Sequence, residues 1–202
     1  FDADGDGDDD VFLCNLWGAS RLLLSDGRGR FSEAAAGLGP KTLCRGAAAA
    51  DADGDGRPDL FVSAGTGPQA LFESFASTPP RPLTDQAAFT QGYGGAVGSW
   101  QEDALHLASG GGAFREASST TLEGRAGMSW SPLLDDLDLD GDEDMYLVNG
   151  FYPDTLFFHD EVKLLRLGRG DGTFAAAPAG HGADFLGTSR SSLTADFDAD
   201  GC

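Results

Sequence analysis

The sequence is short of basic residues. Its 202 residues contain 13 Lys and Arg against 33 Asp and Glu, which gives a formal net charge of −20 at pH 7. A nucleic-acid groove needs a basic surface to neutralise phosphates, so this charge excludes nucleic acid as a partner. The same charge opposes adsorption to anionic membranes. The chain is nevertheless no disordered acidic tail, because 41% of its residues are hydrophobic and 14 are Phe, enough to build a core.

Long apolar runs and cysteine are also scarce. No stretch approaches the roughly 18–20 apolar residues of a membrane-spanning helix. The 3 Cys residues lack Cys-x-x-Cys or Cys/His spacing, so neither a zinc site nor a disulfide framework is expected. Cys14 lies in an apolar, strand-like run, which favours a buried thiol; a Cys14–Cys44 bridge is the alternative in an oxidising compartment. The chain starts at Phe1 and stops at Cys202, each within an acidic cluster, as a segment of a longer polypeptide would.

What the sequence does contain is Asp, in short and regular clusters. It has 26 Asp but only 7 Glu. Three clusters, beginning at Asp2, Asp51 and Asp136, follow the pattern D-x-D-x-D-G-x-x-D. A fourth begins at Asp196 and reaches the last residue before the pattern is complete. Solubility alone would neither select Asp over Glu nor repeat one spacing, so the clusters indicate a shared chemical role.

The spacing within the clusters suits a calcium ion. Ca²⁺ takes about six to eight oxygen ligands, and carboxylates at positions 1, 3 and 5 of a tight loop can converge on one point. Gly at position 6 permits the sharp turn, and the carbonyl group at position 7 points inward. An EF-hand would close the site with Glu at position 12, where this chain has Leu13, Val62 and Leu147. The closing acid is instead at position 9, so the loops are not EF-hands.

Short apolar runs follow the closing Asp of each complete loop, and their β-branched and aromatic residues predict buried strands. These runs are residues 11–15, 60–64 and 145–149. A second strand, such as residues 21–25, is expected next, and then a glycine-rich turn that leads to a Phe and a third strand. The Phe residues are Phe31, Phe114 and Phe174. A fourth strand of small residues should precede the next Asp loop, at 47–50, 128–134 and 191–195.

Four strands in a repeat of about 45 residues are typical of a β-propeller blade. With these loops, and with runs such as 144–150 and 168–174, the sequence resembles the FG-GAP/VCBS repeat family, whose blades build the seven-bladed head of integrin α subunits. Within that family it looks most like the cartilage-acidic-protein and UnbV-type branch. The expected fold is therefore all-β: a partial propeller of about four four-stranded blades, from a ring of seven, with Ca²⁺-binding loops.

The repeats place the whole chain, residues 1–202, in one propeller segment. Blades are expected at residues 2–50, 51–94, 95–135 and 136–195, and residues 196–202 begin a further blade. The third blade requires residues 95–103 to be a decayed loop that keeps only its last acid, Asp103, so no ion is expected there. The fourth blade carries an insertion around residues 160–167.

The resemblance implies calcium sites in the Asp clusters. The side chains of positions 1, 3, 5 and 9 and the carbonyl group of position 7 would be the ligands. They are Asp2, Asp4, Asp6, Asp8 and Asp10 in the first loop; Asp51, Asp53, Asp55, Arg57 and Asp59 in the second; Asp136, Asp138, Asp140, Asp142 and Asp144 in the third; and Asp196, Asp198 and Asp200 in the incomplete fourth.

The His and Trp residues give no catalytic pattern. His106, His159 and His181 have no carboxylate or hydroxyl partner at a telling spacing, so they are expected at the surface or in loops. The three Trp residues are expected to pack between blades or at their faces. They are Trp17, Trp100 and Trp130.

The resemblance implies a non-catalytic module. Ca²⁺ would stabilise the fold, and the blades would bind or scaffold other protein chains, or a glycan, within a larger protein or assembly. The rival function is enzymatic, because propellers of this family also occur in or beside polysaccharide lyases and phospholipases; the sequence has no catalytic motif of its own. A third alternative is an assembly subunit whose partner chains cover open strand edges. The family implies a Ca²⁺-rich compartment: extracellular, periplasmic or lumenal.

Overall fold

A computed structural model describes residues 1–15, 19–38, 44–64, 103–117, 129–150 and 161–198. Within these ranges every regular element is a β-strand, and every strand pairing is antiparallel. None of the described segments is a helix of the length and apolarity that crossing a membrane requires. The all-β class predicted from the sequence is confirmed.

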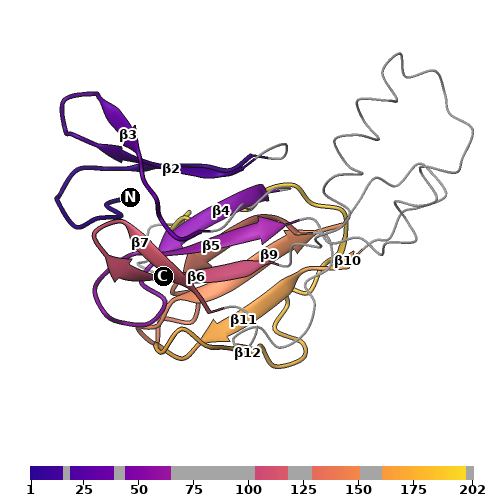
Figure 1. Cartoon of the computed structure of the whole chain (residues 1–202). Coiled ribbons are helices and arrows are strands. Elements are labelled where there is room, and N and C mark those ends of the chain that lie inside the picture. Colours follow the sequence, from indigo (N-terminus) through magenta and orange to yellow (C-terminus); the bar gives the residue numbers. More distant parts are fainter. Residues whose placement is uncertain (16–18, 39–43, 65–102, 118–128, 151–160, 199–202) are drawn as a thin grey trace, which may run out of the picture.

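The strands form three main sheets and one small pair (Figure 1). The first sheet has the order β1 (Val11–Leu13), β2 (Arg21–Ser25), β3 (Phe31–Glu33). The second has the order β4 (Cys44–Ala50), β5 (Asp59–Ala64), β6 (Ala104–Gly110), β7 (Ala113–Glu116). The third has the order β8 (Ser129–Asp135), β9 (Asp144–Asn149), β11 (Leu164–Gly168), β12 (Phe174–Ala176). The short strands β10 (Glu161–Val162) and β13 (Leu186–Gly187) pair with each other.

The predicted strands and turns are mostly present. The apolar runs that follow the closing Asp form β1, β5 and β9. Glycine-rich turns join β2 to β3, β6 to β7 and β11 to β12. Glycines in these turns, such as Gly27 (φ 64°) and Gly172 (φ 77°), adopt the left-handed backbone that other residues avoid. Each turn delivers a Phe to the first or second position of the next strand.

The sheets are grouped differently from the predicted blades. The strand before an Asp loop pairs with the strand after it, so that Ala50 lies opposite Asp59 and Asp135 lies opposite Asp144. The predicted boundaries separated these strands. They also separated β5 from β6, which pair through Phe61 and Leu105. In the second and third sheets, hydrogen bonding makes the Asp loop the connection between the first two strands. Of the expected decayed loop at 95–103, only Asp103 lies within the described residues.

Two further expectations concern the region near the third sheet. The expected insertion at residues 160–167 overlaps β10 and most of β11. Residues 191–195 form no strand.

The core lies between the sheets, and β5 is buried on both of its faces. Leu60 and Val62 belong to an apolar cluster that also contains Leu22 and Phe114, between the first and second sheets. Phe61, on the opposite face of the strand, belongs to a second cluster between the second and third sheets. Its partners include Leu105, Met145, Leu147 and Phe174. The second sheet is therefore packed between the other two.

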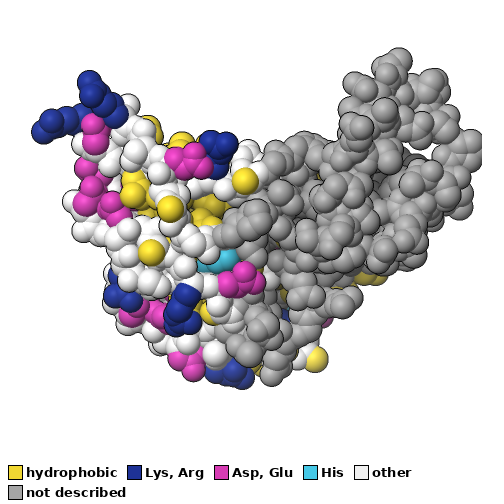
Figure 2. Space-filling model, viewed as in Figure 1, with side chains coloured by type: hydrophobic (Ala, Val, Ile, Leu, Met, Phe, Trp, Pro, Cys, Tyr) yellow, Lys and Arg dark blue, Asp and Glu magenta, His cyan; other side chains and the backbone are white. Residues whose placement is uncertain are grey.

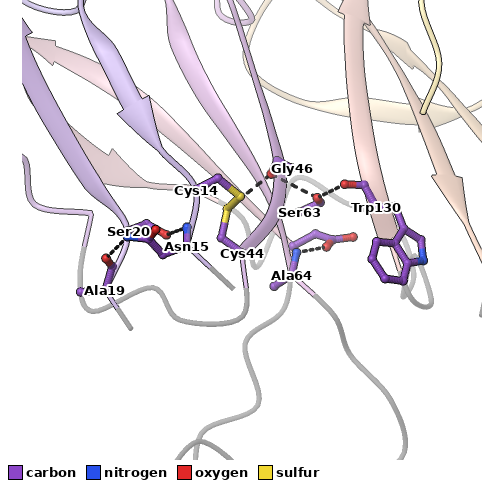
Figure 3. Close-up of a disulfide and its surroundings, with 10 residues drawn as sticks. Cys14, Asn15, Ala19, Ser20, Cys44, Gly46, Ser63, Ala64 and Trp130 are labelled. Carbon is purple, nitrogen blue, oxygen red and sulfur yellow. Dashed lines mark hydrogen bonds between the residues drawn. A yellow bond between two sulfur atoms is a disulfide. The ribbon is translucent and has the colours of Figure 1, made fainter. Parts of the chain in front are cut away.

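A disulfide bond joins the first two sheets (Figure 3). Cys14 directly follows β1, and Cys44 begins β4; their Cα atoms are 5.2 Å apart. The Cys44 N–H also donates to the carbonyl group of Asn15, at 3.2 Å. The expectation of a buried Cys14 thiol was wrong, because the approach of these cysteines depends on packing between sheets, which the residues around Cys14 do not encode.

The junction between the second and third sheets is held by other contacts. Trp130 of β8 lies between two guanidinium groups, with Arg45 at 4.2 Å and Arg190 at 3.9 Å from its ring centroid. Each of these three residues stands six positions before the first Asp of a cluster, so they are equivalent positions in successive repeats. Ser63 Oγ donates to the carbonyl groups of Gly46 and Trp130, at 3.1 Å each (Figure 3).

The His and other Trp predictions have mixed outcomes. His106 is fully buried in β6, against the expectation of a surface residue, because β6 is an interior strand covered on both sides. His181 is exposed, as expected. Trp130 packs between residues of successive repeats, also as expected. His159, Trp17 and Trp100 lie outside the described residues.

Reduction of the disulfide should destabilise the protein. The bond joins residues 30 positions apart, and the chain entropy it removes from the unfolded state corresponds to about 3–4 kcal/mol. Urea unfolding should therefore show a lower midpoint with dithiothreitol or in Cys14→Ser. Cys202→Ser is the matched control and should leave the midpoint unchanged. If dithiothreitol did not change the urea midpoint, the disulfide would not stabilise the folded state.

Candidate metal centres

The three complete Asp loops lie on one side of the sheets. The first, residues 2–10, leads into β1; the second, 51–59, joins β4 to β5; and the third, 136–144, joins β8 to β9. All three are on the left in Figure 1, and acidic side chains follow the same border in Figure 2. The clusters that are separate in the sequence thus share one edge of the molecule.

The first Asp of each loop folds the loop around its own carboxylate. Asp51 accepts hydrogen bonds from the N–H groups of Asp55 (3.0 Å) and Gly56 (2.8 Å). Asp136 accepts the same pair from Asp140 and Gly141, both at 3.0 Å. Asp2 accepts them from Asp6 (3.2 Å) and Gly7 (2.9 Å). Position 5 in turn accepts the N–H of position 7 in all three loops. Local Asx-type bonds therefore fix one repeated turn.

The closing Asp is buried and ties its loop to the sheet. Asp10, Asp59 and Asp144 are 5%, 0% and 1% exposed. In each case one carboxylate oxygen accepts the N–H of loop position 2, and the other accepts an N–H from the neighbouring strand. The donors are Ala3 (2.8 Å) and Ser25 (2.8 Å) for Asp10, Ala52 (3.0 Å) and Ala108 (2.7 Å) for Asp59, and Leu137 (3.1 Å) and Gly168 (2.8 Å) for Asp144.

Carboxylates converge in every complete loop. Three acids of each loop offer oxygen atoms within 4.8 Å of one another. The groups are Asp2, Asp4 and Asp6; Asp51, Asp53 and Asp59; and Asp136, Asp138 and Asp144. Asp53 Oδ1 is buried and has no hydrogen-bond donor among the described residues. Hard carboxylate oxygens, one of them buried without a donor, fit a Ca²⁺ ion, which would be held by these side chains and would cancel their charge.

Several predicted ligands lie outside these groups. Asp10 is not among the converging carboxylates of the first loop, and Asp55 forms an ion pair with Arg57. Asp140 accepts the N–H of Asp142. The side chains of Asp8 and Asp142 lie against the glycine turns, where a Cβ at Gly27 or Gly170 would overlap their carboxylates. Asp196 and Asp198 are described, but Asp200 is not, so the fourth cluster has no complete geometry.

Burial opposes the ionised form of the central acids. It raises the pKa of Asp59 to about 6, with smaller contributions in the same direction from Asp53 and Asp55, while the N–H groups of Ala108 and Ala52 act in the opposite direction. Burial is also the largest cause of the raised pKa values of Asp53 and Asp144, and other acids of the same loop add to it. A bound cation would favour ionisation and reverse these shifts.

Sequence reasoning missed a backbone requirement at loop position 4. Gly5 and Gly54 have positive φ there (84° and 72°), in addition to the glycine that was expected at position 6. In the third loop the same place is taken by Leu139, the single non-glycine residue with positive φ among the described residues (61°). Two of the three loops have Gly at position 4. A comparison of the three loops would therefore have indicated the need for positive φ at this position.

Sequence reasoning also missed that the glycine turns of the second and third sheets contact the Asp loop of the preceding sheet. The Gly172 N–H donates to the Ala52 carbonyl group at 2.9 Å, and a Cβ at Gly172 would lie 3.4 Å from Asp53 Cβ. Gly112 stands in the same relation to Asp4, at 3.6 Å. The small residues at loop position 2, Ala3 and Ala52, were the available signal. An ion in the first or second loop would therefore lie at a junction between two sheets.

The metal-free protein should gain stability as the pH falls. The pKa of Asp59, about 6, exceeds its unfolded value of 3.8, so its protonation stabilises the folded state. This contribution is complete below pH 3.8 and is lost as the pH rises through about 6. In EDTA, the urea midpoint should thus be higher at pH 5.5 than at pH 7.5. Asp59→Asn should reduce this difference in midpoint. Asp9→Asn, at an exposed side chain, is the control. If Asp59→Asn left the pH dependence of the urea midpoint unchanged, Asp59 would not be its cause.

Comparison with known families identifies the repeat. Residues 2–62 match the model of the FG-GAP-like repeat, a stretch that contains the first two Asp loops and the strands β1 to β4 between them. Comparison with curated proteins gave no significant match. The match supports an FG-GAP-like repeat within residues 2–62.

Proposed function

We propose that the chain is a non-catalytic, Ca²⁺-stabilised β-propeller module that serves as a binding or scaffolding surface for other protein chains, or for a glycan. FG-GAP-like repeats are generally non-catalytic and often bind Ca²⁺. The observation that carries the proposal is the geometry of the three loops, each of which gathers three carboxylates within 4.8 Å around a turn with the same hydrogen bonds.

Calcium has a structural role in this proposal. Carboxylates held this close repel one another: burial is the main cause of the raised pKa of Asp59, and repulsion from Asp53 and Asp55 adds to it. A divalent cation between them removes the repulsion and fixes the connection between the first two strands of a sheet. Because the unfolded chain has no preformed site, binding free energy adds to folding free energy.

The arrangement of repeats supports a propeller. Neighbouring sheets pack face to face, as the blades of a propeller do. The second sheet lies between the other two, so its strand β5 is buried on both faces. Arg45, Trp130 and Arg190, at equivalent positions of successive repeats, stack in sequence order, which fits strands that follow one another around an axis. A ring of seven blades, as in the family, would require further repeats beside the ones described.

The compartment proposed is extracellular, periplasmic or lumenal. A Cys14–Cys44 disulfide persists in an oxidising compartment, and such compartments are also rich in Ca²⁺. The partner surface proposed includes the outer edge of β1, which pairs with β2 alone among the described residues. Val11 and Leu13, at this edge, are partly exposed. An unpaired strand edge of this kind attracts a further strand.

Removal of calcium should lower the stability of the full chain. Excess EDTA should reduce the melting temperature by at least several degrees, because three sites contribute binding energy to the folded state. Asp4→Ala should reduce the Ca²⁺ stoichiometry in isothermal calorimetry by one. Asp9→Ala removes the same charge from the same loop at a side chain that is 92% exposed and should leave the stoichiometry intact. An EDTA-insensitive melting temperature without calcium uptake would refute the proposal.

The edge of β1 should be protected by a partner strand. In the full-length protein or its assembly, the backbone amides of Val11 to Leu13 should exchange hydrogen slowly, as they do when both edges of a strand are paired. The central strand β5, which is paired on both sides, is the internal reference. Amides of β1 that exchange much faster than those of β5 in the full-length protein or its assembly would rule out this use of the edge.

A further inference from the structure

One loop differs from the other two at position 7. Asp8 and Asp142 occupy this position in the first and third loops, and Arg57 occupies it in the second. The Arg57 Nη2 forms an ion pair with Asp55 Oδ2, and it also lies 3.4 Å from the carbonyl oxygen of Ala108. A cation supplied by the chain itself is therefore already bound to one of the four predicted side-chain ligands of this loop.

The substitution changes the charge of the loop as a whole. Residues 2–10 contain six Asp, a formal charge of −6, and residues 136–144 contain five Asp and Glu143, again −6. Residues 51–59 contain four Asp and Arg57, which leaves −3. Ca²⁺ affinity in loops of carboxylates follows ligand charge, so the second loop should attract the ion least.

The second loop nevertheless gathers carboxylates for an ion. Asp51, Asp53 and Asp59 converge as in the third loop, and Asp53 Oδ1 is buried without a hydrogen-bond donor among the described residues. A cation in the loop would satisfy that oxygen. The weakness of this site would thus come from Arg57 and from the lower charge, not from a missing ligand.

We infer that Arg57 is an intramolecular competitor that makes the loop at 51–59 the low-affinity calcium site of the three. Ca²⁺ and the guanidinium group compete for Asp55, so the ion must displace Arg57 from that carboxylate before it gains the full ligand set. This inference rests on the proposed function, because it concerns the same ions. The inference goes beyond the proposed function because it ranks the three loops by Ca²⁺ affinity and names Arg57 as the residue that determines the ranking.

The position of the weak site gives it a consequence. Ala52, in the same loop, accepts the N–H of Gly172 from the turn of the third sheet, and Gly172 packs beside Asp53. The contact between the second and third sheets therefore includes the loop whose occupancy changes at the highest Ca²⁺ concentration. The other two loops would already be filled in that range.

The test is a calcium titration of the full chain by isothermal calorimetry and equilibrium dialysis. The natural chain should show two tight sites and a third at least about tenfold weaker. Arg57→Asp, which restores the residue of the other loops, should bring the third site to within about threefold of the tight ones. Arg57→Ala should give an intermediate affinity. Asp55→Ala should further weaken or abolish the weak site alone.

Arg21→Ala is the matched control. Arg21 is also an exposed arginine paired with an acid, Glu33 at 2.9 Å, but it lies at the far end of β2 from the Asp loops. It should leave all three affinities unchanged. Arg57 is 49% exposed at its side chain, so its variants should fold, which circular dichroism verifies.

The outcomes separate the two proposals. Three equal sites in the natural chain, or a weak site that Arg57→Asp does not strengthen, would overturn the role of Arg57 while leaving calcium binding intact. If Arg21→Ala had the same effect as Arg57→Ala, net charge would explain the change in affinity, and the role of Arg57 would be overturned as well. No calcium uptake by any loop would overturn both this inference and the proposed function.

Discussion

A buried carboxylate at the ninth position of each Asp loop is the constraint on which the described fold depends. Asp10, Asp59 and Asp144 each accept one N–H from their own loop and one from the next strand, with little exposure to solvent. Hydrogen bonds to a charged group are worth about 1.5–3 kcal/mol each, but burial of an uncompensated charge is unfavourable. The bonds therefore fix the loop to the sheet, and the residual charge makes a nearby cation favourable.

The same carboxylates position the contacts between sheets. A loop held at position 9 presents the small residue of position 2 to the neighbouring sheet, where Ala52 accepts the Gly172 N–H and joins the apolar cluster of Phe174. Gly172 has a positive φ of 77°, which disfavours a side chain there, and a Cβ would lie 3.4 Å from Asp53 Cβ. In the third loop position 2 is Leu137, which is partly exposed, since no described sheet covers it. Loop chemistry and sheet packing are thus two aspects of one repeated structure.

The elements predictable from the sequence are those with a short-range cause. The Asp frame, the strands after it and the glycine turns depend on residues within about ten positions, and they are present as predicted. The grouping of strands into sheets, the Cys14–Cys44 bond and the burial of His106 depend on contacts between distant segments, and they were missed. The ninth Asp was predicted as a ligand, but its hydrogen bonds to Ala108 and Gly168 come from strands far along the chain. A single-sequence pattern contains no record of such partners.

The most direct test of this account is a crystal structure of the chain grown in Ca²⁺, with anomalous difference density measured at long wavelength. The account predicts a peak in each loop, among the carboxylates of residues 2–10, 51–59 and 136–144, with the lowest occupancy in the second loop at limiting Ca²⁺. The closing Asp residues should keep their two backbone hydrogen bonds in that structure. Loops with the same turn and no anomalous peak at saturating Ca²⁺ would contradict it, because the carboxylates would then act only as acceptors for the backbone.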